Sequence, residues 1–258
     1  TKMKSIPVIL PPINEQNRIT AKTDRLLAKV DACKARLDKV SEIIRRFRQS
    51  VLAAATSGKL TEDWRDENSD SESAEELLNK IRMERRAYWE KEQIEKFKAN
   101  GKTPKNDRWR TKYKEPSLLN TEGLIKLPKK WMWSSIGEIA LSMKNGIYKH
   151  SSYYNSEGTP CLRMYNIQNG KIDWTDIKRM VLDDKEIAEY ELKSGDILVN
   201  RVNSRELVGK AALITSKIEK SVYESKNIRL QIAVNVNSSY VNYWMMLAGN
   251  KHFSNNAQ

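Results

Sequence analysis

Residues 19–54 of the sequence read ITAKTDRLLAKVDACKARLDKVSEIIRRFRQSVLAA. Apolar side chains recur here at alternating steps of three and four residues, with Thr23 as the one polar member of the series. This spacing is the heptad pattern of a coiled coil. A helix over these residues is about 54 Å long, and its apolar stripe needs a second helix to cover it, from this protein or from a partner. We call the following positions the seam: Ile19, Leu26, Val30, Cys33, Leu37, Val40, Ile44, Phe47 and Val51.

Local signals predict where this helix begins and ends. Pro11 and Pro12 exclude a helix before them, and Asn14 is placed to cap the first turn. The Thr-Ser-Gly run at 56–58 ends the helix, because glycine readily adopts the left-handed conformation that closes a helix. An ordinary bundle helix is the alternative interpretation, but an uninterrupted seam of five heptads favours a spacer.

Composition limits the class of protein. The 258 residues are enough for one or two domains. No apolar run reaches membrane-spanning length, and the first residues lack the apolar stretch of a signal peptide, so we expect a cytoplasmic protein. Two cysteines and two histidines are too few to predict a zinc cluster, and we expect both cysteines to be reduced. The sequence therefore indicates no metal and no cofactor.

Positive charge is concentrated at the two ends of the chain. The sequence has 46 basic and 33 acidic side chains, a formal net charge of +13. Residues 1–60 have a basic excess of eight, residues 61–126 have none, and residues 127–258 have an excess of five. Two basic parts around a neutral middle suit a polyanion such as nucleic acid. A protein that is basic only for solubility is the alternative.

The rest of the chain divides by pattern. Residues 5–13 are apolar and rich in proline, which predicts an extended strand. Residues 73–99 predict a charged helix with a Ser-x-x-Glu capping box, and the turn signals at 102–126 predict a linker. From residue 127 the pattern changes to short strands between turns, followed by a helix at 240–253, which predicts an α+β domain with a β-rich core. The predicted strands are 131–133, 161–165, 196–200, 211–215 and 229–234.

Motifs for catalysis are missing from the sequence. No glycine-rich loop is followed by Lys-Ser or Lys-Thr, so a P-loop is not indicated. His150 and His252 do not form a Ser-His-Asp or Cys-His pattern with other residues. The acidic pair Asp183 and Asp184 lies in a polar turn without a partner motif. The sequence favours binding over catalysis.

Three loops of the C-terminal domain carry side chains that suit nucleic acid. Lysine, tyrosine and histidine in a turn can contact phosphates and bases, whereas arginine can bind guanine and asparagine or glutamine can bind adenine through paired hydrogen bonds. Each such residue alone is more often a turn former or a surface group, but three clusters in one basic domain favour DNA. The candidates are Lys144, Asn145, Tyr148, Lys149 and His150 in the first loop, Arg163, Tyr165, Asn166 and Gln168 in the second, and Arg201, Asn203, Ser204 and Arg205 in the third.

Several runs of sequence resemble a known family. Residues 6–19 and 49–65, at the two ends of the heptad helix, resemble the central conserved region of type I restriction-modification specificity subunits. Three further runs, at 133–140, 158–167 and 192–199, look like strands of that family's target recognition domain. The resemblance covers nearly the whole chain.

The resemblance implies a domain organisation. In that family two target recognition domains are separated by two antiparallel helices that set their spacing, and each domain binds half of a split DNA sequence. Residues 14–58 would be a coiled-coil spacer helix, 59–126 a charged helix and linker, and 127–258 a β-rich α+β target recognition domain that is incomplete at its C-terminal end. Residues 1–13 would be the terminal strand of a preceding recognition domain that this chain lacks.

The resemblance also implies partners. These are double-stranded DNA, methyltransferase subunits, the restriction subunit through them, and a second specificity fragment or a second copy of this chain. The chain would have no catalytic activity of its own. The alternative to a DNA-recognition subunit is a protein of another functional class, a coiled-coil assembly protein that binds other proteins without DNA specificity. The dependence of affinity on salt concentration distinguishes the two functions, because DNA binding weakens steeply as salt rises and an apolar helix contact does not.

Overall fold

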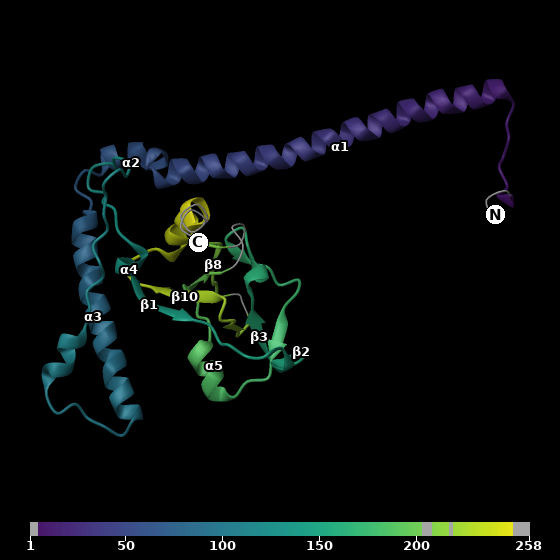
Figure 1. Ribbon diagram of the computed structural model, residues 1–258. Coiled ribbons are helices and arrows are strands. Elements are labelled where there is room, and N and C mark those ends of the chain that lie inside the picture. Colours follow the sequence, from purple (N-terminus) through teal and green to yellow (C-terminus); the bar gives the residue numbers. More distant parts are fainter. Residues whose placement is uncertain (1–4, 203–207, 217–218, 250–258) are drawn as a thin grey trace. The chain divides into compact units, whose positions relative to one another are not determined.

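The computed structural model describes residues 5–202, 208–216 and 219–249. The chain divides into two compact units, Thr1–Val51 and Leu52–Gln258, and each is described by itself. Most of the first unit is one helix, α1 (Ile13–Thr56), whose 44 residues extend for about 66 Å (Figure 1). The long helix and the β-sheets of the second unit together confirm the α+β fold class.

The helix α1 begins at Ile13, two residues before the start at Glu15 that a cap at Asn14 predicts. The carbonyl of Pro12 accepts hydrogen bonds from the amides of Glu15 and Gln16 at 2.9 and 3.0 Å. Asn14 therefore lies inside the first turn, and its predicted role as the cap is wrong. The predicted end is confirmed, because α1 stops at Thr56 and Gly58 has a left-handed φ of 82°.

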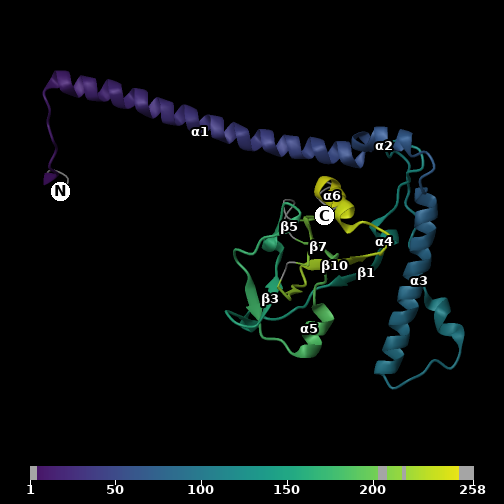
Figure 2. The same ribbon diagram turned by 180° about the vertical axis from the view of Figure 1, so that it is seen from behind.

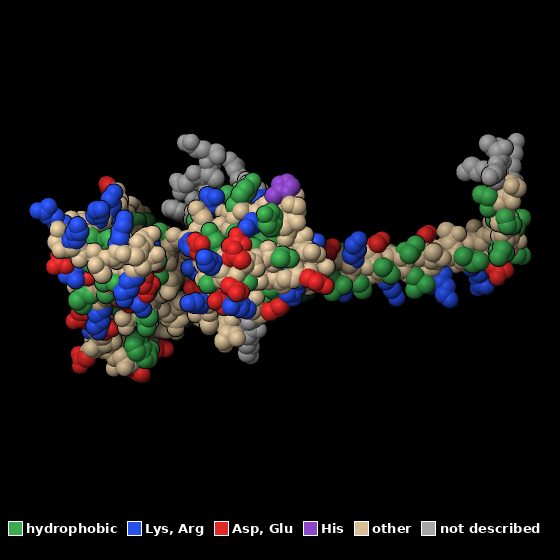
Figure 3. Space-filling model, turned by 90° about the horizontal axis from the view of Figure 1, so that it is seen from below, with side chains coloured by type: hydrophobic (Ala, Val, Ile, Leu, Met, Phe, Trp, Pro, Cys, Tyr) green, Lys and Arg blue, Asp and Glu red, His purple; other side chains and the backbone are tan. Residues whose placement is uncertain are grey.

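The seam is exposed to solvent along its whole length. Its large apolar side chains are between 39% exposed at Val51 and 69% exposed at Leu37, and Cys33 is exposed as well. Figure 3 shows hydrophobic side chains beside Lys and Arg along this helix. Ion pairs from Glu42 to Arg45 and Arg46, both 2.7 Å long, support the helix locally, but surface pairs contribute little to stability. Coverage of the seam by a second helix stays a prediction.

The strand predicted over 5–13 is not present in the part that the structure describes. Residues 6–12 are neither helix nor strand, and Ile9 and Leu10 are 92% and 82% exposed. A strand needs a neighbour to accept and donate its backbone hydrogen bonds, and three prolines in this stretch have no N–H to donate. Pairing with a preceding domain stays a prediction.

The second unit begins with short helices and the charged helix α3. η2 (Lys59–Thr61) and α2 (Glu62–Glu67) precede α3 (Ala74–Ala99). The predicted capping box of α3 is confirmed: the Glu76 amide donates to Ser73 Oγ, and the Ser73 amide donates to the Glu76 carboxylate at 2.9 Å. One side of α3 is buried, because Leu78 and Ile81 pack against Ala233 of the β-sheet domain.

Part of the predicted linker folds back on α3. The short helix η3 (Asp107–Lys112) places Trp109 against Trp89 and Phe97, with ring centroids 5.8 and 6.1 Å apart. Tyr113 also lies 5.4 Å from Trp89. Figures 1 and 2 show α3 and this segment side by side in both views. The turn signals were correct, but the aromatic residues between them form a packed hairpin instead of an open linker.

Two four-stranded sheets form the β-rich part. The first has the order β1-β10-β7-β8 and is antiparallel throughout. The second has the order β2-β6-β3-β9, with β3 and β9 parallel, and β4 and β5 make a separate hairpin. The strands are β1 (Ala140–Asn145), β2 (Tyr154–Asn155), β3 (Thr159–Leu162), β4 (Ile167–Gln168), β5 (Lys171–Ile172), β6 (Lys178–Met180), β7 (Ile197–Asn200), β8 (Ala211–Leu213), β9 (Val222–Tyr223) and β10 (Asn227–Ile232).

Strand β7 of the first sheet is buried on both faces. Ile197 and Val199 of β7 belong to a cluster with Val241, whereas Leu198 between them belongs to a cluster with Leu162. Alternate residues of a strand point to opposite faces, so a continuous apolar run is the pattern expected of a strand with protein on both sides. The other helices are α4 (Ile136–Ile139), η4 (Ser151–Tyr153), η5 (Met164–Asn166), α5 (Asp184–Tyr190) and α6 (Ser238–Trp244), which continues as η6 (Met245–Gly249).

Two predicted strands differ from the structure. Residues 131–133 form no strand; instead Trp133 packs against Trp244 at 5.5 Å and donates to the carbonyl of Ile125. The strand predicted at 161–165 ends at Leu162, because the chain turns into η5 there. No helix in the described part of the chain is long and apolar enough to cross a membrane.

The docking of α3 can be tested by truncating a buried side chain. Ile81 is 2% exposed, so we expect Ile81→Ala to lower the free energy of unfolding by about 2–5 kcal/mol. Met83 on the same helix is 66% exposed, and Met83→Ala should cost about 0.5 kcal/mol or less. Chemical denaturation of both variants measures the difference. Equal, small losses would contradict the packing of α3 on the sheet.

Candidate nucleic-acid interface

The three candidate loops meet at one turn. Residues 223–227, between β9 and β10, form this turn, which we call the hub. The first loop is joined to it by the Gly146 amide, which donates to the Asn227 carbonyl at 3.1 Å. Next to it, the Ile147 amide donates to the Tyr223 carbonyl, and the Ser225 amide donates to the Ile147 carbonyl, both at 2.9 Å. The first loop is thus held by its backbone.

The second and third loops are joined to the same hub. The amide of Met164 donates to the Glu224 carboxylate at 2.9 Å, and the Glu224 amide donates to the Leu162 carbonyl at 3.0 Å. In the third loop, the Arg201 amide donates to the Lys226 carbonyl at 3.0 Å. The hub therefore brings together residues that lie up to 81 positions apart in the sequence, the separation of the bonded pair Gly146 and Asn227.

The hub was missed in the sequence. Its five residues, Tyr-Glu-Ser-Lys-Asn, contain neither glycine nor proline, so no turn signal marks them. Its one visible sign is a short polar run between two apolar stretches. Buried Asn227 donates to the Leu162 carbonyl at 3.3 Å, and exposed Lys226 adds a cation between the first and third loops.

The cations of the first loop are held by α5. Lys144 pairs with Glu189 at 2.8 Å and lies 4.7 Å from the centre of the Tyr190 ring. Lys149 pairs with Glu186 and lies over the Tyr153 ring. Both lysines point toward carboxylates of their own domain, so their charge is partly neutralised.

The remaining first-loop residues are more open. Tyr148 is 84% exposed, and Asn145, the last residue of β1, is also exposed. His150 caps η4, because its Nδ1 accepts the amide of Ser152 at 3.3 Å. This bond leaves the exposed imidazole its second nitrogen, Nε2, as a donor to a ligand.

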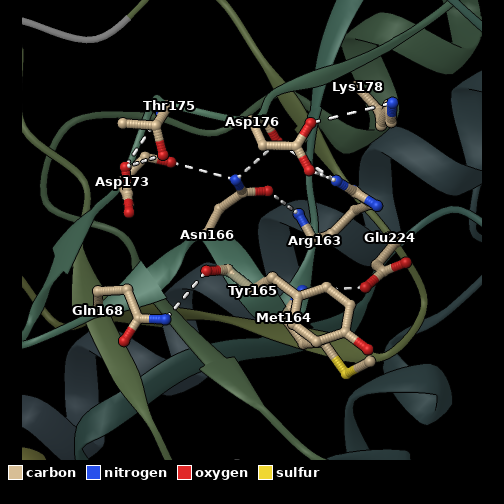
Figure 4. A network of polar contacts seen from close by, with 10 residues as sticks. All are labelled: Arg163, Met164, Tyr165, Asn166, Gln168, Asp173, Thr175, Asp176, Lys178 and Glu224. Atoms are coloured by element: carbon tan, nitrogen blue, oxygen red, sulfur yellow. Dashed lines mark hydrogen bonds and ion pairs between the residues drawn. The ribbon is translucent and has the colours of Figure 1, made fainter. Parts of the chain in front are cut away.

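The second loop is built around a buried asparagine (Figure 4). Asn166 is 2% exposed, and its Oδ1 accepts the Arg163 amide at 2.9 Å. Its Nδ2 donates to the carbonyls of Asp173 and Asp176 at 3.1 and 3.2 Å. The side chain is therefore occupied inside the domain, which suits a role in shaping the loop and leaves it no free group for a base.

Neighbouring side chains of the second loop differ in how open they are. Arg163 pairs with Asp176 at 3.0 Å and its side chain is only 19% exposed. Gln168 is half-buried and donates to the carbonyl of Tyr165 at 3.2 Å. The Tyr165 ring is 55% exposed, with the Arg163 guanidinium 6.0 Å from its centre. Tyr165 is thus the most open of the second-loop candidates.

The third loop contributes one described candidate. Arg201 is exposed, and its Nε donates to the carbonyl of Ser225 in the hub at 2.9 Å. Its two terminal nitrogens make no hydrogen bond with the described residues. The candidates Asn203, Ser204 and Arg205 lie outside the described residues.

Buried groups beneath the loops are held in their neutral forms. Burial raises the pKa of the Cys161 thiol to about 12 and that of the Tyr223 hydroxyl to about 12. The Tyr223 hydroxyl donates to the Lys144 carbonyl at 3.1 Å. Both side chains therefore stabilise the support of the loops and are not nucleophiles near neutral pH. Within the described residues, no group of three His, Cys, Asp or Glu is placed to hold a metal ion.

Comparison with known proteins gives relatives of one kind. The chain is 27% identical over 240 residues to the type I restriction enzyme EcoKI specificity subunit of Escherichia coli K12, a match that covers 92% of this chain and 39% of the relative. It is 28% identical, over the same shares, to the StySPI specificity subunit of Salmonella potsdam. Over 57 residues it is 54% identical to the EcoBI specificity subunit of Escherichia coli, covering 22% of this chain and 12% of that protein.

The EcoKI and StySPI alignments cover most of this chain but less than half of each relative. The chain spans about two fifths of the length of the curated relatives that it matches over most of its own length. Among solved structures, the HsdS subunit from Thermoanaerobacter tengcongensis aligns with 98% of this chain and 48% of its own, at 16% identity and a TM-score of 0.41. No family model matches the chain.

The contact between the first loop and the hub can be tested at Gly146. A Cβ atom there would lie 2.3 Å from the carbonyl oxygens of both Tyr223 and Glu224, so we expect Gly146→Ala to lower the free energy of unfolding by about 1–3 kcal/mol. Gly137→Ala is the control, since the nearest atom to its added Cβ is Ser135 Oγ at 3.6 Å. Urea denaturation compares the two. An equally stable Gly146→Ala variant would show that this close approach does not exist.

Proposed function

We propose, on the premise that this chain is a relative of the type I restriction enzyme specificity subunits, that it recognises DNA for such a system. It would bind one half of a bipartite duplex site through the loops at 144–150, 163–168 and 200–205. The observation that carries the proposal is the convergence of these polar loops on the hub. A single rigid centre lets side chains from distant parts of the sequence meet one short stretch of DNA.

The exposed side chains suggest a division of work. Arg201, whose two terminal nitrogens make no hydrogen bond with the described residues, has the geometry to donate a pair of hydrogen bonds to guanine. Tyr148 and Tyr165 offer open rings and hydroxyls, and Lys226 and His150 offer donors to phosphates. Asn166 acts indirectly in this proposal, by holding the second loop in shape. Asn203, Ser204 and Arg205 remain candidates because they follow Arg201 along the chain.

Cations that already have a carboxylate partner in the domain are expected to add less to DNA affinity than unpaired ones. Lys144, Lys149 and Arg163 each have a carboxylate partner in the domain, and DNA must compete with that partner. Exchange of an internal carboxylate for a phosphate leaves the number of ion pairs unchanged, so these residues would orient the duplex more than they would add affinity. Arg201 has no carboxylate partner among the residues that the structure describes, so it is the residue we expect to matter most.

The seam would serve assembly. Its exposed apolar side chains along α1 need a covering helix, and we propose that methyltransferase subunits, with a restriction subunit through them, dock at this helix. A second specificity fragment or a second copy of this chain is another source of that helix. The chain itself would not be catalytic and would act in the cytoplasm, where its DNA lies.

A coiled-coil assembly protein without DNA specificity is the competing function. It would explain the seam equally well, but it gives no reason for three polar loops to be joined at one hub in a domain with a basic excess. The two proposals differ in what the β-rich domain binds.

The first test removes the guanidinium of Arg201. A duplex bound by the chain is first selected from a random library, and binding of Arg201→Ala to it is measured by fluorescence anisotropy. We expect a loss of about 1–3 kcal/mol on the selected duplex and a smaller loss on a scrambled one, because a base contact is specific to sequence.

Arg201→Lys is the matched control for charge. It keeps the cation but loses the paired donors, so it should bind scrambled DNA as the unaltered chain does and still discriminate poorly. Equal losses on both duplexes with Arg201→Ala would make this residue a phosphate contact. A chain that selects no duplex at all would contradict the proposed function.

The second test uses Cys33 of the seam as a probe. Cys33 is exposed, whereas Cys161 is 0% exposed and has a pKa of about 12, so the chain alone should expose one fast thiol to iodoacetamide. Addition of the methyltransferase subunit should slow the reaction of Cys33 at least tenfold. The control is a Cys33→Ser chain with Ala35→Cys, which moves the thiol to the opposite side of α1 and should stay reactive. Unchanged reactivity of Cys33 with every partner and at every chain concentration would contradict the seam.

A further inference from the structure

A strongly basic segment lies outside the three loops and outside α1. We call residues 91–114, the far end of α3 and the segment that returns along it through η3, the basic hairpin. Its nine cations outnumber three acidic residues, whereas residues 61–90 have five cations and ten acidic residues. The balanced charge of the middle of the chain therefore conceals two regions of opposite sign. The cations are Lys91, Lys96, Lys98, Lys102, Lys105, Arg108, Arg110, Lys112 and Lys114.

These cations are available to a ligand. All nine residues are exposed. Lys96 lies 3.8 Å from Glu92, and Arg110 lies 3.5 Å from Glu90 and 3.7 Å from Asp107. The other seven make no ion pair with the residues that the structure describes. Exposed pairs at such distances contribute little, so nearly all of the positive charge faces solvent.

The basic hairpin has a rigid support. Contacts among the rings of Trp89, Trp109, Tyr113 and Phe97 hold its two arms together, with centroids between 5.4 and 6.1 Å apart. The part of α3 before it is fixed to the sheet by Arg85, which donates to the Ala140 carbonyl, and by Tyr88, which donates to Gln231. A surface that is already ordered loses less entropy when it binds.

The chemistry of the surface favours phosphate over protein. Protein interfaces have an apolar or aromatic centre. No large hydrophobic side chain between residues 91 and 114 is among the exposed ones, because the rings are turned toward each other. Of the eighteen exposed residues in this segment, nine are lysine or arginine and only two are acidic. From Lys91 to Lys98 the helix rises about 10 Å, a distance over which duplex DNA carries roughly six negative charges.

We propose that the basic hairpin is a second DNA-binding surface, which contacts the phosphate backbone regardless of sequence. The partner depends on the proposed function, namely that the chain binds duplex DNA. The role does not depend on base recognition by the loops, because the hairpin adds charge and not specificity.

The test removes charge from the hairpin in the full chain. Lys98, Lys102 and Lys105 are replaced by Gln together, and binding to a random-sequence duplex is measured by fluorescence anisotropy over a series of salt concentrations. We expect the slope of log K against log salt to become shallower by about 2 to 3, because each lost phosphate contact removes about 0.9. Replacement of the same three residues by Arg should leave the slope unchanged.

A matched control removes equal charge elsewhere. Lys59, Lys126 and Lys129 are exposed residues of the same unit, and their joint replacement by Gln should change the slope by less than one. An unchanged slope in the hairpin variant, or an equal change in the control, would overturn the proposal. Circular dichroism melting curves check that all variants are folded.

The effect of the hairpin variant on DNA binding can be distinguished from the effect of a loop variant. The hairpin variant should weaken binding to selected and scrambled duplexes equally and leave their ratio intact, whereas Arg201→Ala changes the ratio. A shallower slope with no effect of Arg201 would support the hairpin and count against base reading by the loops.

Discussion

The backbone hydrogen bonds of the hub are the constraint on which the β-rich domain depends. Residues 223–227 connect β9 of one sheet to β10 of the other, and they bond at the same time to the loops after β1, β3 and β7. A turn that satisfies so many partners has little freedom to move. Gly146 shows how tight the arrangement is, since two carbonyl oxygens occupy the place where a Cβ would be. Because the hub holds the loops, the exposed side chains of Tyr148, Tyr165 and Arg201 need not hold them in place.

Charge in this domain is arranged in two ways. Cations near the loops are matched with carboxylates, such as Lys144 with Glu189 and Arg163 with Asp176, whereas most cations of the basic hairpin have no such partner among the described residues. A paired cation is oriented but partly neutralised. An unpaired cation retains its full long-range field, which attracts a polyanion from a distance. Paired cations near the loops therefore suit contacts that depend on geometry, whereas unpaired cations of the basic hairpin suit contacts that depend on charge alone.

Much of the fold was predictable from local patterns. The long helix α1 with its end at Thr56, the capping box at Ser73 and the α+β class follow from periodicity and turn residues, and the structure confirms them. The strands predicted at 196–200, 211–215 and 229–234 are present with shifted ends, at Ile197–Asn200, Ala211–Leu213 and Asn227–Ile232. Failures occurred where tertiary contacts decide. Residues 131–133 have strand propensity, but Trp133 packs against Trp244 instead. Residues 107–113 fold back because four aromatic rings meet there.

The candidate site was predictable only in part. The resemblance to specificity subunits, carried by residues 6–19 and 49–65, is confirmed by the relatives, and the polar loops stand out by composition. By itself the sequence determined the long amphipathic helix, the change to short strands after residue 127 and the basic charge, because these depend on residues that are neighbours along the chain. Only the tertiary structure decided that Asn166 is buried, that Lys144 is paired, and that three loops share one hub. Hydrogen bonds between residues 60 to 80 positions apart leave no mark on local sequence.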